Sequence, residues 1–319
     1  MWGLQSRDVW IETAGLAVAA AALYASGFFA LIFLLPLAAL LRRRGLRAVL
    51  WGAGIAVLGI TIVDAVRLSR LGAGLGSSWL IAWNWTLPVG LLVGLLVMEA
   101  PLPRLGRTLY RLLAGWAAAM VVTVPLFLKV GADGTLRAFL ESQFAVLGAA
   151  TDAGEAGSSG AEMLADTAVR VLGNTYGVGL LVLLVVNWYL GAYLAYRFST
   201  GVAPPPRLAH FVVPSQAVWV LIASVAGVVL TFFATVGPIE PIAWNVALVS
   251  LLLYGVQGIA VARHLLTHYR VAQGVRMLII IGAIVLLFVP GVNLIVLLGL
   301  PGLGVSELWI DYNRFERRR

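Results

Sequence analysis

Long apolar runs recur along nearly the whole 319-residue chain and are separated by short gaps that carry arginine. Hydrophobic residues make up 61% of the sequence and charged residues 11%, whereas a water-soluble fold has roughly a quarter of its residues charged. A helix needs about 20 apolar residues to cross the hydrocarbon layer, and several runs reach that length. The sequence therefore predicts an all-α, polytopic helical bundle in a membrane, organised as a single transmembrane domain over 1–319.

The apolar runs predict seven or eight membrane segments. The first run, 14–41, is longer than one crossing requires and contains Pro36, so we expect it to tilt, kink or break near Ser26-Gly27. The last run, 277–300, carries Pro290-Gly291 at its centre. The clearer runs between them cover 48–66, 79–98, 112–130, 171–196, 217–236 and 242–262.

The arginines predict which ends of the segments face the cytoplasm, because Lys and Arg accumulate in cytoplasmic loops. Alternate gaps are arginine-rich, and we assign these to the cytoplasm: Arg42, Arg43, Arg44, Arg47, Arg104, Arg107, Arg111, Arg197, Arg207, Arg263, Arg270 and Arg276. Simple crossings alone would leave the arginine-rich tail, 305–319, outside. One segment must therefore enter and leave on the same side. The run with Pro290-Gly291 is the first candidate, as two half-helices, and a split first helix is the alternative.

These assignments predict a multi-pass protein of the bacterial inner (cytoplasmic) membrane with a cytoplasmic C-terminal tail at 305–319. The net charge of +8 rests almost wholly on arginine. In a soluble protein this balance would suggest nucleic acid, but here the arginines flank apolar runs, where they meet anionic lipid. The expected partner is thus the lipid bilayer, with anionic lipid at its cytoplasmic face, and not nucleic acid.

The longest connection, 131–168, lies on the outer side by the same argument. Apolar residues recur in it with helical spacing and predict an amphipathic surface helix: Leu136, Phe139, Leu140, Phe144 and Leu147. The part at 151–160, rich in Gly, Ser and Asp, is typical of a loop. We expect a solvated tether, with a lid over an outer-facing cavity as the alternative.

Several kinds of chemistry have no support in the sequence. The absence of cysteine excludes disulfides and thiolate metal sites, and the only lysine, Lys129, completes no glycine-rich phosphate loop. His264 and His268 have the i, i+4 spacing of a metal-binding pair, with His210 as a third candidate. Solvated histidines beside arginines explain that pattern better. No catalytic residue, cofactor or metal is therefore predicted, and we expect a protein that is not an enzyme.

Polar side chains inside apolar runs are the candidate ligand-binding groups, because each must find a partner away from water. Amides lining a cavity with tryptophan walls suit a small, uncharged or aromatic ligand. The alternative is that the amides join helices by hydrogen bonds and that the tryptophans are interfacial anchors. The predicted residues are Asn84, Trp85, Asn187, Asn245 and Gln257, with Asn293 as a further amide.

Small residues in the first run form a stripe at Ala17, Ala21 and Ala25. Such stripes let helices approach backbone to backbone, and this one predicts a docking face for a partner membrane protein. An alanine-rich chain also produces the same spacing by chance.

The C-terminal third carries motifs of a known family. Gln257-Gly258 lies in the penultimate long run, the next run is broken at Pro290, and the chain closes with Trp309, Asp311 and Arg314. In these features, most closely over 211–314, the chain resembles the bacterial YybS-like family, the domain of unknown function 2232. One departure is that Tyr312-Asn313-Arg314 stands in place of the family's compact Phe-Arg.

The resemblance implies a function only by analogy. The family is similar in organisation to the substrate-binding subunits of energy-coupling-factor (ECF) vitamin transporters and to the rod-shape protein MreD. A transporter subunit would have an outer-facing cavity near Asn84 and Trp85 and would dock an energising partner through the alanine stripe. A MreD-like scaffold would have a filled core and bind through its cytoplasmic loops and tail. We expect a small-molecule-binding or transport-related subunit, with a scaffold or assembly protein as the alternative.

Overall fold

A computed structural model of the chain describes residues 2–70, 78–100, 108–150, 154–206, 211–234 and 239–310. The chain divides into two compact units, each of which is considered by itself. Unit 1 comprises Met1–Leu172 and Gly179–Pro205, and unit 2 comprises Gly173–Val178 and Pro206–Arg319. The predicted all-α, polytopic class is confirmed: these ranges contain no strand, and five of their helices are long and apolar enough to cross a membrane.

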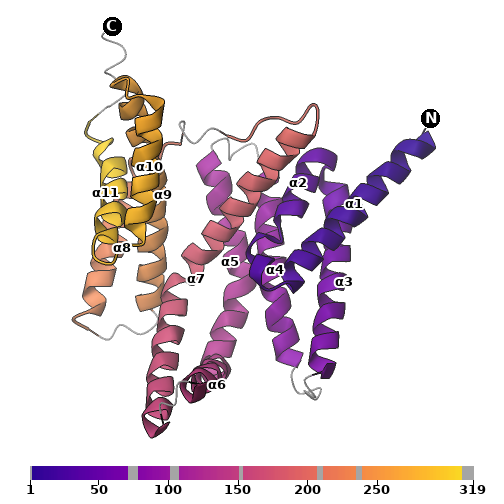
Figure 1. The fold of residues 1–319 in the computed structure, drawn as a ribbon, viewed down its shortest axis with the longest axis horizontal. Coiled ribbons are helices and arrows are strands. Elements are labelled where there is room, and N and C mark those ends of the chain that lie inside the picture. Colours follow the sequence, from indigo (N-terminus) through magenta and orange to yellow (C-terminus); the bar gives the residue numbers. More distant parts are fainter. Residues whose placement is uncertain are drawn as a thin grey trace. The chain divides into compact units, whose positions relative to one another are not determined.

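Unit 1 begins with a helical hairpin in place of one long helix (Figure 1). Its elements are α1 (Trp2–Ala25), the 3-10 helix η1 (Phe28–Ile32) and α2 (Leu35–Arg44). Glu12, in the first half of α1, forms ion pairs of 2.6 Å with both Arg43 and Arg44 at the end of α2. The end of α2 therefore lies beside the middle of α1, and the first run is interrupted near Ser26-Gly27, one of the outcomes that the sequence allows.

Long helices complete unit 1, and small residues let some of them approach closely. They are α3 (Leu46–Arg70), α4 (Ser78–Glu99), α5 (Thr108–Ala132), α6 (Thr135–Ala150) and α7 (Gly154–Phe198). A Cβ added at Gly59 of α3 would lie 2.9 Å from Cβ of Ala21 in α1. A Cβ at Gly94 of α4 would lie 2.7 Å from the carbonyl oxygen of Gly115 in α5. Substituted residues at these contacts would force the helices apart.

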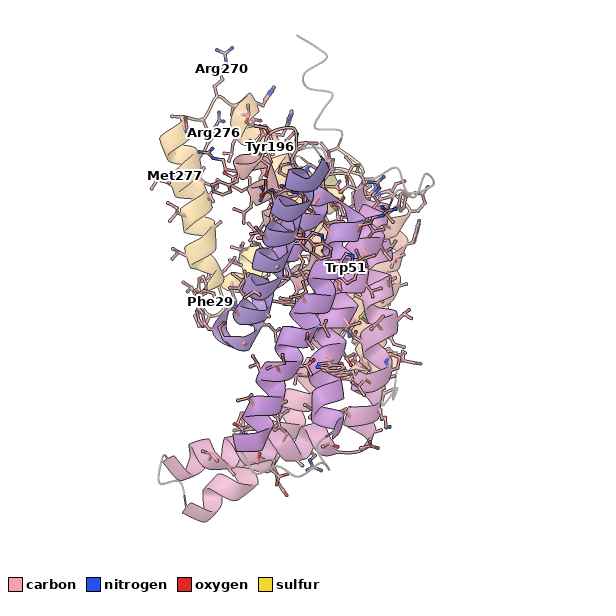
Figure 2. The ribbon with its side chains drawn as sticks, turned by 90° about the vertical axis from the view of Figure 1, so that its right-hand side faces the viewer. Phe29, Trp51, Tyr196, Arg270, Arg276 and Met277 are labelled. Atoms are coloured by element: carbon pink, nitrogen blue, oxygen red, sulfur yellow. The ribbon has the colours of Figure 1, made fainter. Side chains whose placement is uncertain are left out.

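The connection after α5 is more helical than the sequence predicts. α6 supplies the expected helix and turns away from the direction of α5 (Figures 1 and 2). The region expected to be a loop at 151–160 differs, because α7 already begins at Gly154. Ala161 and Ala165 are buried, and Arg137 of α6 contacts Asp166 of α7 at 2.8 Å. This packing stabilises helical turns whose glycines disfavour them.

Unit 2 contains one turn of α7 together with α8 (Ala217–Thr231), α9 (Ile239–His268), α10 (Gln273–Leu287) and α11 (Asn293–Ser306). The predicted interruption at Pro290-Gly291 is present: α10 and α11 form a second hairpin around a turn in which Gly291 has a φ of 83° (Figure 1). With 15 and 14 residues, the two helices are about 22 and 21 Å long. Each is shorter than the roughly 30 Å hydrocarbon layer.

Candidate functional site

The candidate site is the first break, which we define as residues 26–34, together with the face of α7 that packs on it. Ser26 Oγ donates a hydrogen bond to Leu23 O at 2.6 Å and accepts one from Phe29 N at 3.1 Å. Gly27 has a φ of 73°, a conformation that glycine adopts without the steric cost of a side chain. Phe29 lies at the tip of the hairpin (Figure 2). Because the break interrupts the helical ladder, its backbone carbonyls need other donors.

Asn187 of α7 supplies one such donor. Its side chain is fully buried, and its Nδ2 donates to Leu31 O at 2.7 Å and to Leu183 O at 2.8 Å. Its Oδ1 is also buried but accepts no hydrogen bond from any residue that the structure describes. A buried polar atom nearly always has a partner in a native protein. Asn187 therefore presents a free acceptor beside the first break.

Trp188, the next residue, joins a charged cluster. Its Nε1 donates to Glu99 Oε1 at 2.5 Å, and the same oxygen lies 2.5 Å from Nη2 of Arg42. The guanidinium carbon of Arg42 lies 5.7 Å from the centre of the Trp188 ring, within the range of a cation–π interaction. The cluster joins the ends of α2 and α4 to α7 just beyond the first break.

Gly191 completes this face of α7, one turn after Asn187. A Cβ at Gly191 would lie 2.5 Å from Cβ of Ala38, 3.0 Å from Leu35 O and 3.1 Å from Ala39 N. The backbones of α2 and α7 are therefore in contact at this position. Asn187, Trp188 and Gly191 together hold α2 and the first break against α7.

Asn245, in unit 2, has no free bonding group of the same kind. Its Oδ1 accepts from Gly177 N at 2.6 Å, and its Nδ2 donates to Gly173 O at 2.8 Å and Pro241 O at 2.7 Å. This amide fastens α9 to one turn of α7 within the unit. It has the helix-joining role that the sequence offers as the alternative to ligand binding.

Gln257-Gly258, the motif on which the family resemblance rests, has a structural role in unit 2. Gln257 Oε1 accepts from Val213 N at 2.9 Å, and its Nε2 donates to Glu307 Oε2 at 2.7 Å. The carbonyl group of Leu300 in α11 occupies the space that a Cβ at Gly258 would need. The amide and the adjacent glycine thus fix α11 directly against α9.

The predicted ligand residues do not gather at one place. Asn187 belongs to unit 1, whereas Asn245 and Gln257 belong to unit 2, where they are about 18 Å apart along α9. Trp85 lies in α4 with a buried Nε1 that has no hydrogen-bond partner among the described residues. The side chain of Asn84 lies outside the described residues, and Asn293 begins α11.

The remaining predicted sites receive less support as surfaces for other molecules. Ala17 and Ala21 are buried, and Ala21 packs on Gly59 of α3, so much of the stripe already contacts this chain's own helix. Trp309 is exposed, but Asp311 and Arg314 lie outside the described residues. The rings of His264 and His268 stack with centres 6.5 Å apart, and His210 lies outside the described residues. No group of three potential metal ligands occurs among the residues that were described.

Sequence reasoning missed the cluster of Arg42, Glu99 and Trp188, as well as the close contact at Gly191. Arg42 was assigned to a loop, and Glu99 follows an apolar run, so each has an ordinary explanation by itself. The signal available was that Gly191 lies one helical turn after both Asn187 and Trp188, at i+4 and i+3. The partners of that face come from other parts of the chain, which the local pattern does not identify.

A family model described as Predicted membrane protein (DUF2232) matches residues 86–301 of the chain. This range includes α5 to α10 and the motif Gln257-Gly258. No similar protein was found among the curated proteins, and none was found among the solved structures. The match and the apolar helices together identify a multi-pass membrane protein.

Proposed function

We propose that this chain, which belongs to the DUF2232 family of predicted membrane proteins, is a small-molecule-binding subunit of the bacterial inner membrane. It is not an enzyme in this proposal, and it acts in transport together with a membrane protein partner, as the substrate-binding subunits of ECF transporters do. The observation that carries the proposal is the buried Oδ1 of Asn187 beside the first break, which has no hydrogen-bond partner in the described part of the chain. Broken helices that expose polar groups in the apolar layer are a common form of substrate site in membrane transporters.

The length of the first hairpin supports a position for this break inside the bilayer. Glu12, Arg43 and Arg44 are charged and paired, so we place them at the membrane surface. From Glu12 to Ala25 the chain rises about 20 Å as a helix, less than the roughly 30 Å thickness of the hydrocarbon layer. Non-helical backbone at that depth is tolerated where it is buried in protein or lines a cavity.

The two hairpins also support the proposed topology. If each returns to the side from which it enters, α3, α4, α5, α7 and α9 are full crossings. α8 has only 15 residues, like α10, and we assign it as the sixth crossing because the apolar Phe232 and Phe233 continue it, which gives eight membrane segments in all. The arginine-rich ends at Arg43, Arg111, Arg197 and Arg270 then fall on one side, as the positive-inside rule requires. The N-terminus and the C-terminal tail lie on that cytoplasmic side in this arrangement, and α6 lies outside.

Single cysteines test the topology without background, because the natural chain contains none. We expect Ile11→Cys, Tyr269→Cys and Trp309→Cys, all at exposed positions, to react with a membrane-impermeant maleimide only after the membrane is opened. Ser142→Cys, in α6, should react in intact spheroplasts. Labelling of Trp309→Cys in intact spheroplasts would contradict the returning second hairpin.

The ligand proposal is tested by extracting and identifying small molecules that remain with the full-length protein after purification in mild detergent. We expect one compound, with a group that donates a hydrogen bond, to remain in near-stoichiometric amount. Asn187→Ala removes the free acceptor and should lose the compound. Asn187→Leu also removes the free acceptor while keeping a similar volume, and gives a second variant should the alanine protein be unstable. Asn245→Ala is the matched control, because it removes a buried amide whose polar groups are already used.

A scaffold of the MreD kind is the second candidate, and a different observation favours it. Asn245 and Gln257 use their amide groups to join segments within unit 2, as expected of a filled core. A scaffold predicts that no compound remains with the pure protein and that its cytoplasmic loops bind another protein. Equal retention of a compound by the Asn187 variants and the wild type would also count against the site proposed at the first break.

A further inference from the structure

The corner between α9 and α10, residues 263–277, has a defined backbone. Arg270 N donates to Thr267 O at 3.1 Å and Val271 N donates to Leu266 O at 3.1 Å, the pattern that closes a helix C-terminus. Arg270 is the only non-glycine residue with a positive φ, 50°, among the described residues. The chain therefore holds an arginine at a position that normally favours glycine or asparagine.

Hydrogen bonds hold a second arginine of the corner against α9. Arg276 Nε donates to Val271 O at 2.7 Å, and its Nη1 lies 3.4 Å from Thr267 Oγ1. Thr267 Oγ1 in turn donates to Arg263 O at 2.9 Å. The corner is thus a fixed structure that brings the charge of Arg276 to the last turns of α9. Figure 2 shows Arg270 and Arg276 at the end of α10 that carries Met277.

The corner is positively charged, and no carboxylate of the described residues is paired with its arginines. Arg263, Arg270 and Arg276 form no ion pair with any residue that the structure describes, and 263–277 contains no Asp or Glu. The arginines of unit 1 at positions 42–44 and 137 differ, since each is paired with a carboxylate. Neighbouring unpaired cations repel one another and attract a multiply contacting anion.

An apolar face continues from the corner along α10. Met277 and Leu278 are 64% and 69% exposed, and Ile280, Ile281 and Val285 are exposed as well. A free inorganic anion needs only the arginines, whereas an amphiphile with an anionic head and apolar chains matches both parts of this surface. We propose that the α9–α10 corner is a binding site for an anionic glycerophospholipid. Its phosphate contacts Arg263 and Arg270, with Arg276 beside them, and its acyl chains lie along Met277, Leu278 and Ile281.

Phosphatidylglycerol is the probe, and the full-length protein in a nonionic detergent is the sample. Lipid bound at each added concentration is counted by native mass spectrometry, with phosphatidylcholine as the neutral lipid. We expect phosphatidylglycerol to bind more tightly than phosphatidylcholine. A basic residue near an anionic surface contributes about 1 kcal/mol, so each arginine removed should weaken binding about fivefold and two should weaken it about 25-fold.

The test variants keep the fold of the corner. Arg263→Gln removes one exposed charge, and Arg270→Gly removes another while placing glycine at a positive φ, where it is favoured. Arg276 is left unchanged because its hydrogen bonds hold the turn. Arg270→Lys keeps the charge and should bind within about threefold of the wild type. Arg137→Gln is the matched control, because it removes an exposed arginine that is already paired with Asp166.

Loss of phosphatidylglycerol binding in the double variant, with normal binding by Arg137→Gln, would support the site. Equal binding of the two lipids, or a double variant equal to the wild type, would overturn it. Complete competition by millimolar inorganic phosphate would identify a phosphate site without a lipid component. Loss of a co-purifying protein with unchanged lipid binding would assign the corner to a protein partner, and either of these two results also overturns the proposal.

Discussion

Different interactions hold the two helical hairpins against their neighbouring helices. The hairpin of α1 and α2 is held by polar groups: Asn187 bonds to its turn, and its arginines are paired with Glu12 and Glu99. The hairpin of α10 and α11 has only local backbone hydrogen bonds at its turn among the described residues. It is held by close backbone contact at Gly258 and, at the far end of α11, by the hydrogen bond from Gln257 to Glu307; its neighbouring arginines form no ion pair among the described residues.

The difference indicates which hairpin has chemistry available for a ligand. Burying the polar side chain of Asn187 against the first hairpin has a desolvation cost. Its Oδ1 is left without a hydrogen-bond partner among the described residues, which is unusual for a buried polar atom. In the second hairpin the glycine contact needs no polar group, and the exposed surface is apolar with a basic end. The first therefore suits a small molecule recognised by hydrogen bonds, and the second suits lipid.

The largest effect is expected at the contact that holds the second hairpin. Gly258→Ala places a Cβ where the carbonyl of Leu300 lies, so α9 and α11 must separate, and we expect a loss of about 3 kcal/mol in the free energy of unfolding. Gly255→Ala is the control, since its Cβ would lie 3.7 Å from Cγ of Pro301, an ordinary contact. Denaturant titration in detergent micelles measures both. Equal stability of the two variants would show that the close backbone contact at Gly258 does not hold this hairpin.

A smaller loss is expected when the polar tie of the first hairpin is removed. Asn187→Ala removes both hydrogen bonds donated by a buried side chain, to Leu31 O and Leu183 O, which should cost about 2 kcal/mol of unfolding free energy. Ser142→Ala, which removes an exposed hydroxyl bonded only within α6, should change stability little. The same titration compares the two proteins. An Asn187→Ala protein as stable as the wild type would mean that the first hairpin is also held by packing alone.

The ion pair that fastens α2 to α4 should couple more strongly than an exposed pair. A double-mutant cycle of Arg42→Met and Glu99→Gln is expected to give about 1.5 kcal/mol, because their side chains are 22% and 18% exposed and Trp188 shares the carboxylate. The pair of Arg137 and Asp166, 49% and 59% exposed, should give at most about 0.5 kcal/mol. Similar coupling in both cycles, measured in the same micelles, would contradict the partly buried role of the first pair.

The smallest effects are expected at the two turn glycines, which permit a direct comparison of the hairpins. Neither Gly27→Ala nor Gly291→Ala brings its Cβ within 4 Å of an atom beyond its own chain neighbours, so each tests the backbone conformation alone. We expect about 1 kcal/mol at Gly27, whose φ is positive and whose turn is tied to Asn187. Gly291→Ala should cost less, since a turn with only local bonds relaxes more easily. A larger midpoint shift in thermal unfolding for Gly291→Ala would reverse this ranking.

Much of the architecture was predictable because it depends on local sequence. Runs of about 20 apolar residues identify membrane helices. The interruption at Pro290-Gly291 was expected, and a break near Ser26-Gly27 was one of the expected outcomes beside a tilt or a kink, because proline and glycine disfavour a continuous helix. The helical start of α7 was not expected. Its glycines favour a loop locally, but burial of Ala161 and Ala165 within unit 1 stabilises the helix.

The sequence by itself determined that this is a membrane protein, where its helices are interrupted and which amides lie in apolar surroundings. Only the tertiary structure decided what those features do. Asn187 meets Leu31, 156 positions away, Arg42 meets Glu99 and Trp188, and the paired and unpaired arginines are distinguished by carboxylates on other helices. The physical reason is that solvent preference and backbone conformation are properties of a short segment, whereas a hydrogen bond between helices depends on which backbones the packed small residues allow to approach.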